Sequence, residues 1–467
     1  MKTHRLVDLC LTGLVIALCL SDGACKKAPP ISTQAAKQIR LDWNLKTLVL
    51  AYQDNGDTDA KWDGPAKRAL TEFAHSRAGM IDADEPGPEI IATNVAAAVQ
   101  AGCDDPMIGY LFIKFAMPQT NNRVAYVNAF MKTARNMNQS IYPPIRKFYV
   151  AARALDQIFY TYGGDSAKQP VESEIIPILN DSLNATLADK TVPAVEAYEA
   201  ASTYLGLMKG SADLYQQHYS NVEKSMFENW PDAATTWLLK AEGYYAMGWQ
   251  ARGSGYGDSV SDEGWKTFSK DLTVAETAAK KAWSLDSTDT RIPTLMIQID
   301  EGLQRDRQEM ELWFSRAMQT DPNNFDACNH KLHYLYPQWY GSREEMVAFG
   351  RECVANTNWG GHVPLILTDA HREYWLYIQD AEEKRNYWKN PDVWPDIQAS
   401  FDRFFELNPE ATSYYHNYAW YAYQAEQWDK LNELIPKLGP VNYDYFGGKD
   451  EFDKMIGLAK EHASHPQ

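Results

Sequence analysis

The sequence predicts an all-α protein, a superhelix of stacked antiparallel helical hairpins. Apolar residues recur with a helical period from residue 38 onward. The breaks between these apolar stripes are short and are marked by proline or glycine. A weak repeat of about 35 residues accompanies them, which is typical of stacked repeat units.

The helical period is clearest after Pro144. One helix face there carries Phe148, Ala151, Leu155, Ile158 and Phe159. Similar stripes follow Pro231 and lie between Asn323 and Pro337. Alternating patterns typical of strands are scarce, so we expect helices almost throughout.

Short breaks separate the predicted helices. Each contains a pair of residues that stops or starts a helix, because proline lacks a backbone N–H and glycine tolerates unusual backbone angles. The pairs are Pro143-Pro144, Gly163-Gly164, Trp230-Pro231, Asp321-Pro322, Asn390-Pro391 and Asn408-Pro409. Helices joined by such short connections form antiparallel hairpins.

An internal repeat gives these hairpins a period. Asp286 and Asp321 are 35 residues apart, close to the ~34 residues of a tetratricopeptide (TPR) unit. Counting back from Pro322 places Phe314 and Ala317 at the aromatic and small positions of that unit. The matches cover about residues 270–440 and predict a TPR-like α-solenoid.

The N-terminus is predicted to be an export signal. Its apolar stretch of 12 residues follows two basic residues and is too short to span a bilayer comfortably. Gly23 and Ala24 precede Cys25, as in a bacterial lipoprotein cleavage box, so lipidation of Cys25 and simple secretion are both open. We expect a periplasmic protein, or a lipoprotein of the outer membrane or cell surface.

The predicted organisation has four parts. They are a signal peptide (1–24), a tether (25–37), an N-terminal helical region (38–229) and a TPR-like repeat region (230–467). No stretch after the signal is long and apolar enough for a transmembrane helix, so a lipid anchor is the expected link to a membrane.

The formal net charge of −17 narrows the choice of partner. Nucleic acids and anionic membranes attract basic surfaces, and no run of Lys or Arg interrupts the acidity of this chain. We therefore expect a protein or peptide partner. An acidic groove rich in aromatic side chains would suit a basic partner.

The glycine-rich stretch that begins at Arg252 is the most irregular part of the chain. It lacks the Gly-Lys-Ser/Thr end of a phosphate-binding loop, and a helix rather than a strand is predicted before it. A plain loop between two helices is the simpler interpretation, with Ser261 capping the second helix. Loops on helical scaffolds often carry binding groups, so we expect a ligand or partner contact here. Arg252 would pair with an anionic group of the ligand, and Trp249 and Trp265 would lie on either side of Arg252. Trp339 is predicted to belong to the same ligand contact.

Two cysteines are predicted to lie close together. Helices before and after a turn near residue 340 would pack antiparallel, which brings Cys328 and Cys353 to a similar level. A disulfide and two buried free thiols both remain open. His330 and His333 are near Cys328 in sequence, but the helical angle separates the cysteine from them, so no metal site is expected.

Several segments resemble a known family. The first is Trp249-Gln-Ala-Arg252-Gly-Ser-Gly255 running into Glu263-Gly264-Trp265. Others are Glu311-Leu-Trp313, Leu335-Tyr-Pro337-Gln-Trp339 and Phe349-Gly-Arg-Glu-Cys353. Together they resemble an uncharacterised bacterial family, a domain of unknown function related to tetratricopeptide proteins, over about residues 230–360. The resemblance implies helical repeats and assigns no catalytic residues.

Two functions of different classes follow from these patterns. The first is an exported, membrane-tethered TPR-like scaffold or peptide-binding module of the bacterial cell envelope. The second is an all-helical carbohydrate-active hydrolase that uses paired carboxylates in a Trp-lined cavity. The sequence has no Gly-x-Ser-x-Gly elbow and no recognisable motif around a nucleophilic cysteine, and the hairpin period favours the non-enzymatic module. No catalytic residue, metal or cofactor is expected.

Overall fold

The computed structural model describes residues 33–54, 58–80, 87–118, 122–208, 212–255 and 257–463. Helices are the only regular secondary structure among these residues, so the predicted all-α fold is confirmed. The expected signal peptide (1–24) and Cys25 lie outside the described residues. The first described helix, Thr33–Leu45, includes the end of the expected tether (25–37), so residues 33–37 are helical.

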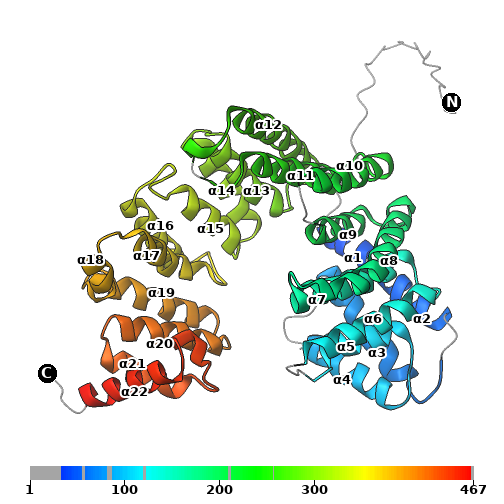
Figure 1. Cartoon of the computed structure of the whole chain (residues 1–467), viewed down its shortest axis with the longest axis horizontal. Coiled ribbons are helices and arrows are strands. Elements are labelled where there is room, and N and C mark those ends of the chain that lie inside the picture. Colours follow the sequence, from blue (N-terminus) through cyan, green and yellow to red (C-terminus); the bar gives the residue numbers. More distant parts are fainter. Residues whose placement is uncertain are drawn as a thin grey trace, which may run out of the picture.

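The helices form an arch in which a crown joins two limbs (Figure 1). The helices of the first limb are α1 (Thr33–Leu45), α2 (Ala51–Asp54), α3 (Asp63–Ala78), α4 (Gly87–Gln100), α5 (Pro106–Phe115), α6 (Arg123–Gln139), α7 (Pro144–Tyr162), α8 (Gln169–Ala188) and α9 (Ala194–Leu207). The helices of the crown are α10 (Ala212–Asn229), α11 (Ala234–Arg252), α12 (Asp262–Leu285), α13 (Arg291–Gly302), α14 (Arg307–Thr320) and α15 (Phe325–Tyr334). The helices of the second limb are α16 (Arg343–Ala355), α17 (Ile366–Tyr377), α18 (Ala381–Asn386), α19 (Trp394–Leu407), α20 (Tyr415–Gln424), α21 (Trp428–Leu434) and α22 (Lys449–Ala463).

Most helices pack chiefly against their neighbours in the chain, and α11 with α12 forms the most extensive pair. The predicted breaks fall between helices. Pro144 is the first residue of α7, Gly163 follows its last turn, and Trp230-Pro231 separates α10 from α11. Asp321-Pro322 separates α14 from α15 in the same way, because proline fits the start of a helix but not its interior.

The two aspartates of the predicted repeat end their helices with nearly the same geometry. Asp286 follows α12 with φ −144° and ψ 105°, and its N–H donates to the carbonyl of Ala282. Asp321 follows α14 with φ −141° and ψ 103°, and its N–H donates to the carbonyl of Ala317. Both carboxylates then accept a backbone N–H two residues later, so α12 and α14 end by the same local mechanism at positions 35 residues apart.

The buried side chains form two hydrophobic cores. The first extends from Leu41 to Ala370, through the first limb and the crown and into α16 and α17 of the second limb, and the second extends from Leu365 to Ala459 in the rest of that limb. Phe148 and Leu155 of the predicted stripe are fully buried in the first core. The expected division at 229/230 coincides with the turn between α10 and α11, and the first core continues across it. None of the described helices has the length and apolarity required to cross a membrane.

Candidate functional site

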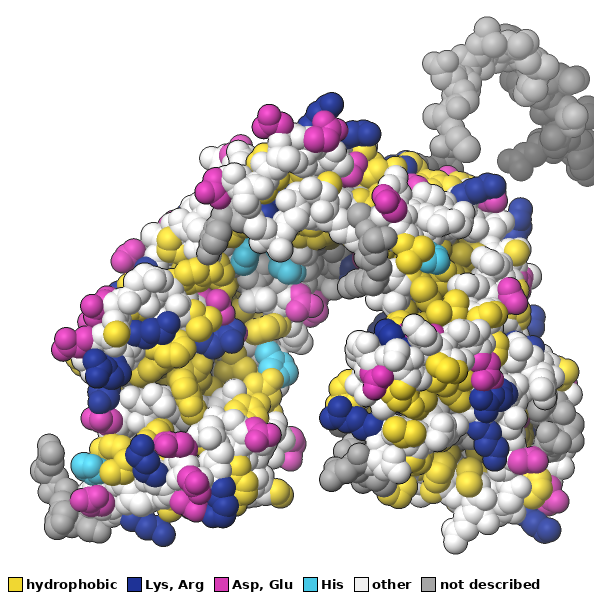
Figure 2. Space-filling view, in the orientation of Figure 1, with side chains coloured by type: hydrophobic (Ala, Val, Ile, Leu, Met, Phe, Trp, Pro, Cys, Tyr) yellow, Lys and Arg dark blue, Asp and Glu magenta, His cyan; other side chains and the backbone are white. Residues whose placement is uncertain are grey.

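A cavity of about 1040 Å³ lies where the end of the α11–α12 hairpin meets the turn after α15. We call it the aromatic cavity. All four residues expected to contact a ligand line it: Trp249, Arg252, Trp265 and Trp339. Hydrophobic and histidine side chains are exposed on the crown beside α15 (Figure 2).

The α11–α12 turn brings the first three of these side chains together. Gly253 ends α11 with φ 76°, a conformation that glycine adopts without strain. Ser261 caps α12 as predicted, because its hydroxyl accepts the N–H of Gly264 at 3.1 Å. A Cβ on Gly264 would lie 2.9 Å from the carbonyl oxygen of Ala251, so the glycine permits the close approach of the two helices.

The guanidinium of Arg252 lies between two indole rings. It is 5.2 Å from the ring centre of Trp249 and 5.1 Å from that of Trp265, within the range of cation–π attraction. Its Nη1 donates to the carbonyls of Gly253 and Gly255, each at 3.0 Å. Arg252 forms no ion pair with any carboxylate in the described ranges, so its charge is available to an anionic group.

Trp339 enters the cavity from the turn between α15 and α16. Its ring centre lies 6.5 Å from that of Trp249 and 5.6 Å from the imidazole of His333. The turn is tight at Gly341, where a Cβ would lie 2.3 Å from the carbonyl oxygen of Leu335. Three indoles from separate segments therefore line one cavity, and Trp265 is 36% exposed.

The polar wall of the aromatic cavity centres on Glu301, whose side chain is buried. Oε2 of Glu301 is 2.8 Å from Nδ1 of His333, and its backbone carbonyl accepts the hydroxyl of Tyr340 at 3.0 Å. The hydroxyl of Tyr245 donates to Oε1 of Gln298 at 3.0 Å. Burial raises the pKa of Tyr245, and the nearby Glu301 raises it further. Tyr245 therefore acts as a neutral hydrogen-bonding group.

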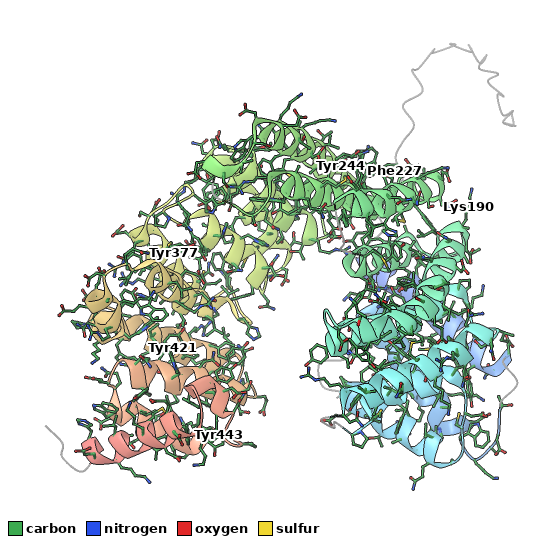
Figure 3. The ribbon with its side chains drawn as sticks, in the orientation of Figure 1. Lys190, Phe227, Tyr244, Tyr377, Tyr421 and Tyr443 are labelled. Atoms are coloured by element: carbon green, nitrogen blue, oxygen red, sulfur yellow. The ribbon has the colours of Figure 1, made fainter. Side chains whose placement is uncertain are left out.

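Further lining residues were not predicted from the sequence. Tyr377, labelled in Figure 3, reaches the cavity from the end of α17 and accepts a hydrogen bond from Nε2 of Gln338 at 2.7 Å. Gln304 and Asn329 supply two more amides. These four residues, Gln304, Asn329, Gln338 and Tyr377, lie on segments far apart in the chain. Gln338 alone falls within a segment that carries the family resemblance, Leu335–Trp339.

The structure also bears on the expected absence of a zinc site. His330 and His333 both line the aromatic cavity. Cys328 is fully buried in the hydrophobic core instead, with its thiol 3.6 Å from the sulfur of Met318. The helix therefore directs the cysteine away from the two histidines, as the helical angle predicts.

One group of carboxylates elsewhere has the spacing of a cation site. Ligand atoms of Glu276, Asp300 and Glu309 lie within 4.8 Å of one another. Lys280 already occupies this position, with Nζ 2.7 Å from Glu276 and 2.9 Å from Glu309, and Arg305 also binds Glu276. Burial raises the pKa of Asp300 to about 8, and Glu309 and Glu276 raise it too. Lys280 and Arg305 therefore balance the charges of Glu276 and Glu309, and they take the place that a metal ion would need.

Cys328 and Cys353 are both buried free thiols. They lie on α15 and α16, the two helices expected to bring them together. Burial raises the pKa of Cys353 strongly, and hydrogen bonding to Cys328 raises it further, which indicates that the two thiols are neighbours. The disulfide stays a prediction.

Comparison with known proteins adds no assignment. No protein-family model matches the chain, and no curated protein matches it. The function is therefore inferred from the geometry of the aromatic cavity.

Proposed function

We propose that this protein is a binding module that holds a peptide segment in the aromatic cavity. Arg252 carries the proposal. It is held between two indoles, and among the described residues its hydrogen bonds go to loop carbonyls and to no carboxylate, so its charge can bind a ligand carboxylate. The indoles would pack against apolar groups of the same ligand. A volume of about 1040 Å³ is at the upper end for a small-molecule site and accommodates several amino-acid residues.

The electrostatics of the cavity suit a ligand with charges of both signs. Arg252 offers a cation near the loop, and Glu301 offers a buried carboxylate beside His333. A peptide with one acidic and one basic group would satisfy both. The sequence alone predicted a basic partner. The cavity adds a requirement for an acidic group on the ligand, because it also presents the positive charge of Arg252.

The carbohydrate hydrolase is less well supported. Its chemistry requires two carboxyl groups about 5–9.5 Å apart across the cleaved bond. Among the described residues that line the aromatic cavity, Glu301 is the single carboxylate, and His333 already contacts it. The three indoles and the amides would suit a sugar, but the second carboxylate of the hydrolytic pair is missing from this lining.

The proposal includes a TPR-like superhelix as the scaffold. Consecutive helix pairs such as α11–α12 and α13–α14, and the equivalent turns at Asp286 and Asp321, support it. The resemblance to the uncharacterised TPR-related family points the same way. In such scaffolds the loops and inner helices carry the ligand contacts, which agrees with the position of the aromatic cavity.

Export of the protein is also proposed, on the basis of its N-terminal sequence. The apolar stretch and Gly23-Ala24-Cys25 support cleavage near Cys25 and a location in the cell envelope. Intact-mass measurement of protein from the membrane fraction should give an acylated N-terminal cysteine. An unlipidated mature chain would exclude lipidation but not export, whereas a soluble chain that keeps Met1 would exclude both.

The binding function is tested with peptides. The immobilised protein is panned against a random peptide library, and each selected peptide is titrated while tryptophan fluorescence is recorded. Arg252→Ala should weaken binding by about 10–100-fold, because a charge-assisted hydrogen bond is lost. Arg316→Ala is the matched control, since Arg316 also lies over two indoles, Trp283 and Trp313, but does not line the cavity. Equal affinities for Arg252→Ala and the unmodified protein would refute the proposal.

A further inference from the structure

Arg146 on α7, in the first limb, is a buried cation that has no counter-ion among the described residues. Its side chain is almost fully buried, with a relative exposure of 2%. Nη2 donates to the neutral oxygens of Asn44 and Thr47, each at 2.6 Å, and the guanidinium lies 5.2 Å from the ring of Trp43. No described carboxylate forms an ion pair with it. An uncompensated buried charge is costly, so folded proteins normally pair it.

Arg146 lines a small enclosed cavity of about 90 Å³ in which cations predominate. Arg77 and Lys114 also line it, together with Tyr110 and Tyr149. Lys114 lies over the rings of Phe73 and Phe115, at 5.5 and 5.0 Å, and pairs with no carboxylate in the described part of the chain. Burial lowers the pKa of Lys114, and Arg77 and Arg153 lower it further.

The nearby carboxylates are engaged by other arginines. Glu196 accepts Nε of Arg40 at 2.6 Å and Nη2 of Arg77 at 2.8 Å. Glu199 binds the same two arginines, at 2.6 and 2.7 Å. Arg40 and Arg77 are thereby balanced, whereas Arg146 and Lys114 have no ion-pair partner in the described part of the chain.

Several donors around this cavity also lack an acceptor. Nε of Arg77 and Nε of Arg146 are both buried, and neither has a hydrogen-bond partner among the residues that the structure describes. The hydroxyl of Tyr110 makes no hydrogen bond to any residue that the structure describes. Burial lowers the pKa of Arg146 to about 10, although Glu196 acts to raise it. An excess of positive charge and of free donors calls for an anionic acceptor.

We propose that this cavity binds a small oxyanion, a carboxylate or phosphate group, between Arg77, Lys114 and Arg146. A water molecule takes about 30 Å³ in the liquid, so 90 Å³ is room for about three waters or one such group. A neighbouring cavity of about 380 Å³ shares Tyr110 and Tyr149, and it could hold the remainder of a larger ligand. The site lies on α3, α5 and α7 and does not depend on the aromatic cavity.

The experiment uses inorganic phosphate and acetate as probes. The melting temperature of the purified protein is measured at pH 7 in rising concentrations of each anion, with ionic strength held constant by chloride. Binding to the folded state should raise the melting temperature saturably, by about 1–3 °C. A rise with phosphate alone supports a phosphate ligand, and a rise that includes acetate supports a carboxylate ligand. No rise beyond chloride for either anion would overturn the proposal.

Variants then locate the response. Lys114→Gln removes a side chain that forms no described hydrogen bond, so the fold should persist while the apparent affinity falls about tenfold. Lys132→Gln on α6, an exposed lysine outside the cavity, is the matched control and should keep the full response. Arg146→Met should abolish the anion-induced rise in melting temperature, whatever the melting temperature of this variant without added anion. An anion response in Lys114→Gln equal to that of Lys132→Gln would overturn the assignment.

Discussion

The hydroxyl of Tyr198 donates a 2.6 Å hydrogen bond to Oε1 of Glu242, which joins α9 of the first limb to α11 of the crown. The guanidinium of Arg291 lies over the ring of Tyr198, 4.6 Å from its centre. Burial raises the pKa of Glu242 to about 7, although the hydrogen bond from Tyr198 and the charge of Arg291 act to lower it. The junction between limb and crown therefore contains a carboxyl group that titrates near neutral pH.

Stability should depend on pH through Glu242. Its pKa is higher in the folded state, about 7, than its ordinary value of 4.5, so the folded protein binds more protons between these values. This contribution to stability is fully present below pH 4.5 and is lost as the pH rises to about 7, with a slope of at most about 1.4 kcal/mol per pH unit. Glu242→Gln should make the decline measured by thermal unfolding between pH 5 and 8 shallower, while the share from Asp300, whose pKa is also raised, remains. Exposed Glu263→Gln is the control, and a decline in Glu242→Gln equal to that of the control would contradict the prediction.

Arg252 should contribute little to stability. It is half-buried, and a cation–π contact near the surface is worth about 0.5–1 kcal/mol. Arg252→Ala should therefore lower the free energy of unfolding by about 1 kcal/mol or less, similar to Arg316→Ala. Trp249→Ala should cost about 3 kcal/mol, because its ring packs against Phe268 and Trp339. If chemical denaturation gives Arg252→Ala a loss as large as that of Trp249→Ala, Arg252 is a structural residue.

Cys328 and Cys353 should form a disulfide when the protein folds in an oxidising compartment. Closure of a loop of about 25 residues would raise the free energy of unfolding by about 3 kcal/mol. Thiol counting on the denatured, unreduced protein should then find Cys103 free and the other two blocked. Burial raises the pKa of Cys103 to about 11, which keeps its thiol unreactive. Free thiols at both Cys328 and Cys353 would leave the alternative of two buried cysteines.

Gly350 should be intolerant of substitution. A Cβ on this residue of α16 would lie 2.6 Å from the Cα of Leu367 on α17, so the two helices would have to move apart. Gly350→Ala should cost about 1–3 kcal/mol in denaturant unfolding. Gly457 of α22 is the control, because a Cβ there meets nothing within 4 Å. Gly457→Ala should be stabilising by about 0.5–1 kcal/mol, and similar effects of the two substitutions would disprove the packing argument.

The sequence alone determined the helical class, the helix breaks and the turn mechanism at Asp286 and Asp321. These features depend on groups a few residues apart: the apolar period, proline without its N–H, and a carboxylate that accepts a nearby backbone N–H. The association of Arg252 with Trp249 and Trp265 was predictable for the same reason, because all three lie around one interhelical turn.

Only the tertiary structure decided which distant residues complete the two sites. Tyr245 on α11 and Tyr377 on α17 line the same aromatic cavity, although more than a hundred residues separate them. Likewise nothing near Arg146 in the sequence indicates that the carboxylates of Glu196 and Glu199 are engaged by Arg40 and Arg77. Such groupings follow from how whole helices pack, and small changes in angle at successive helix pairs add up over the arch. Local patterns therefore specify each helix, whereas the sum of many packing contacts selects the residues that meet.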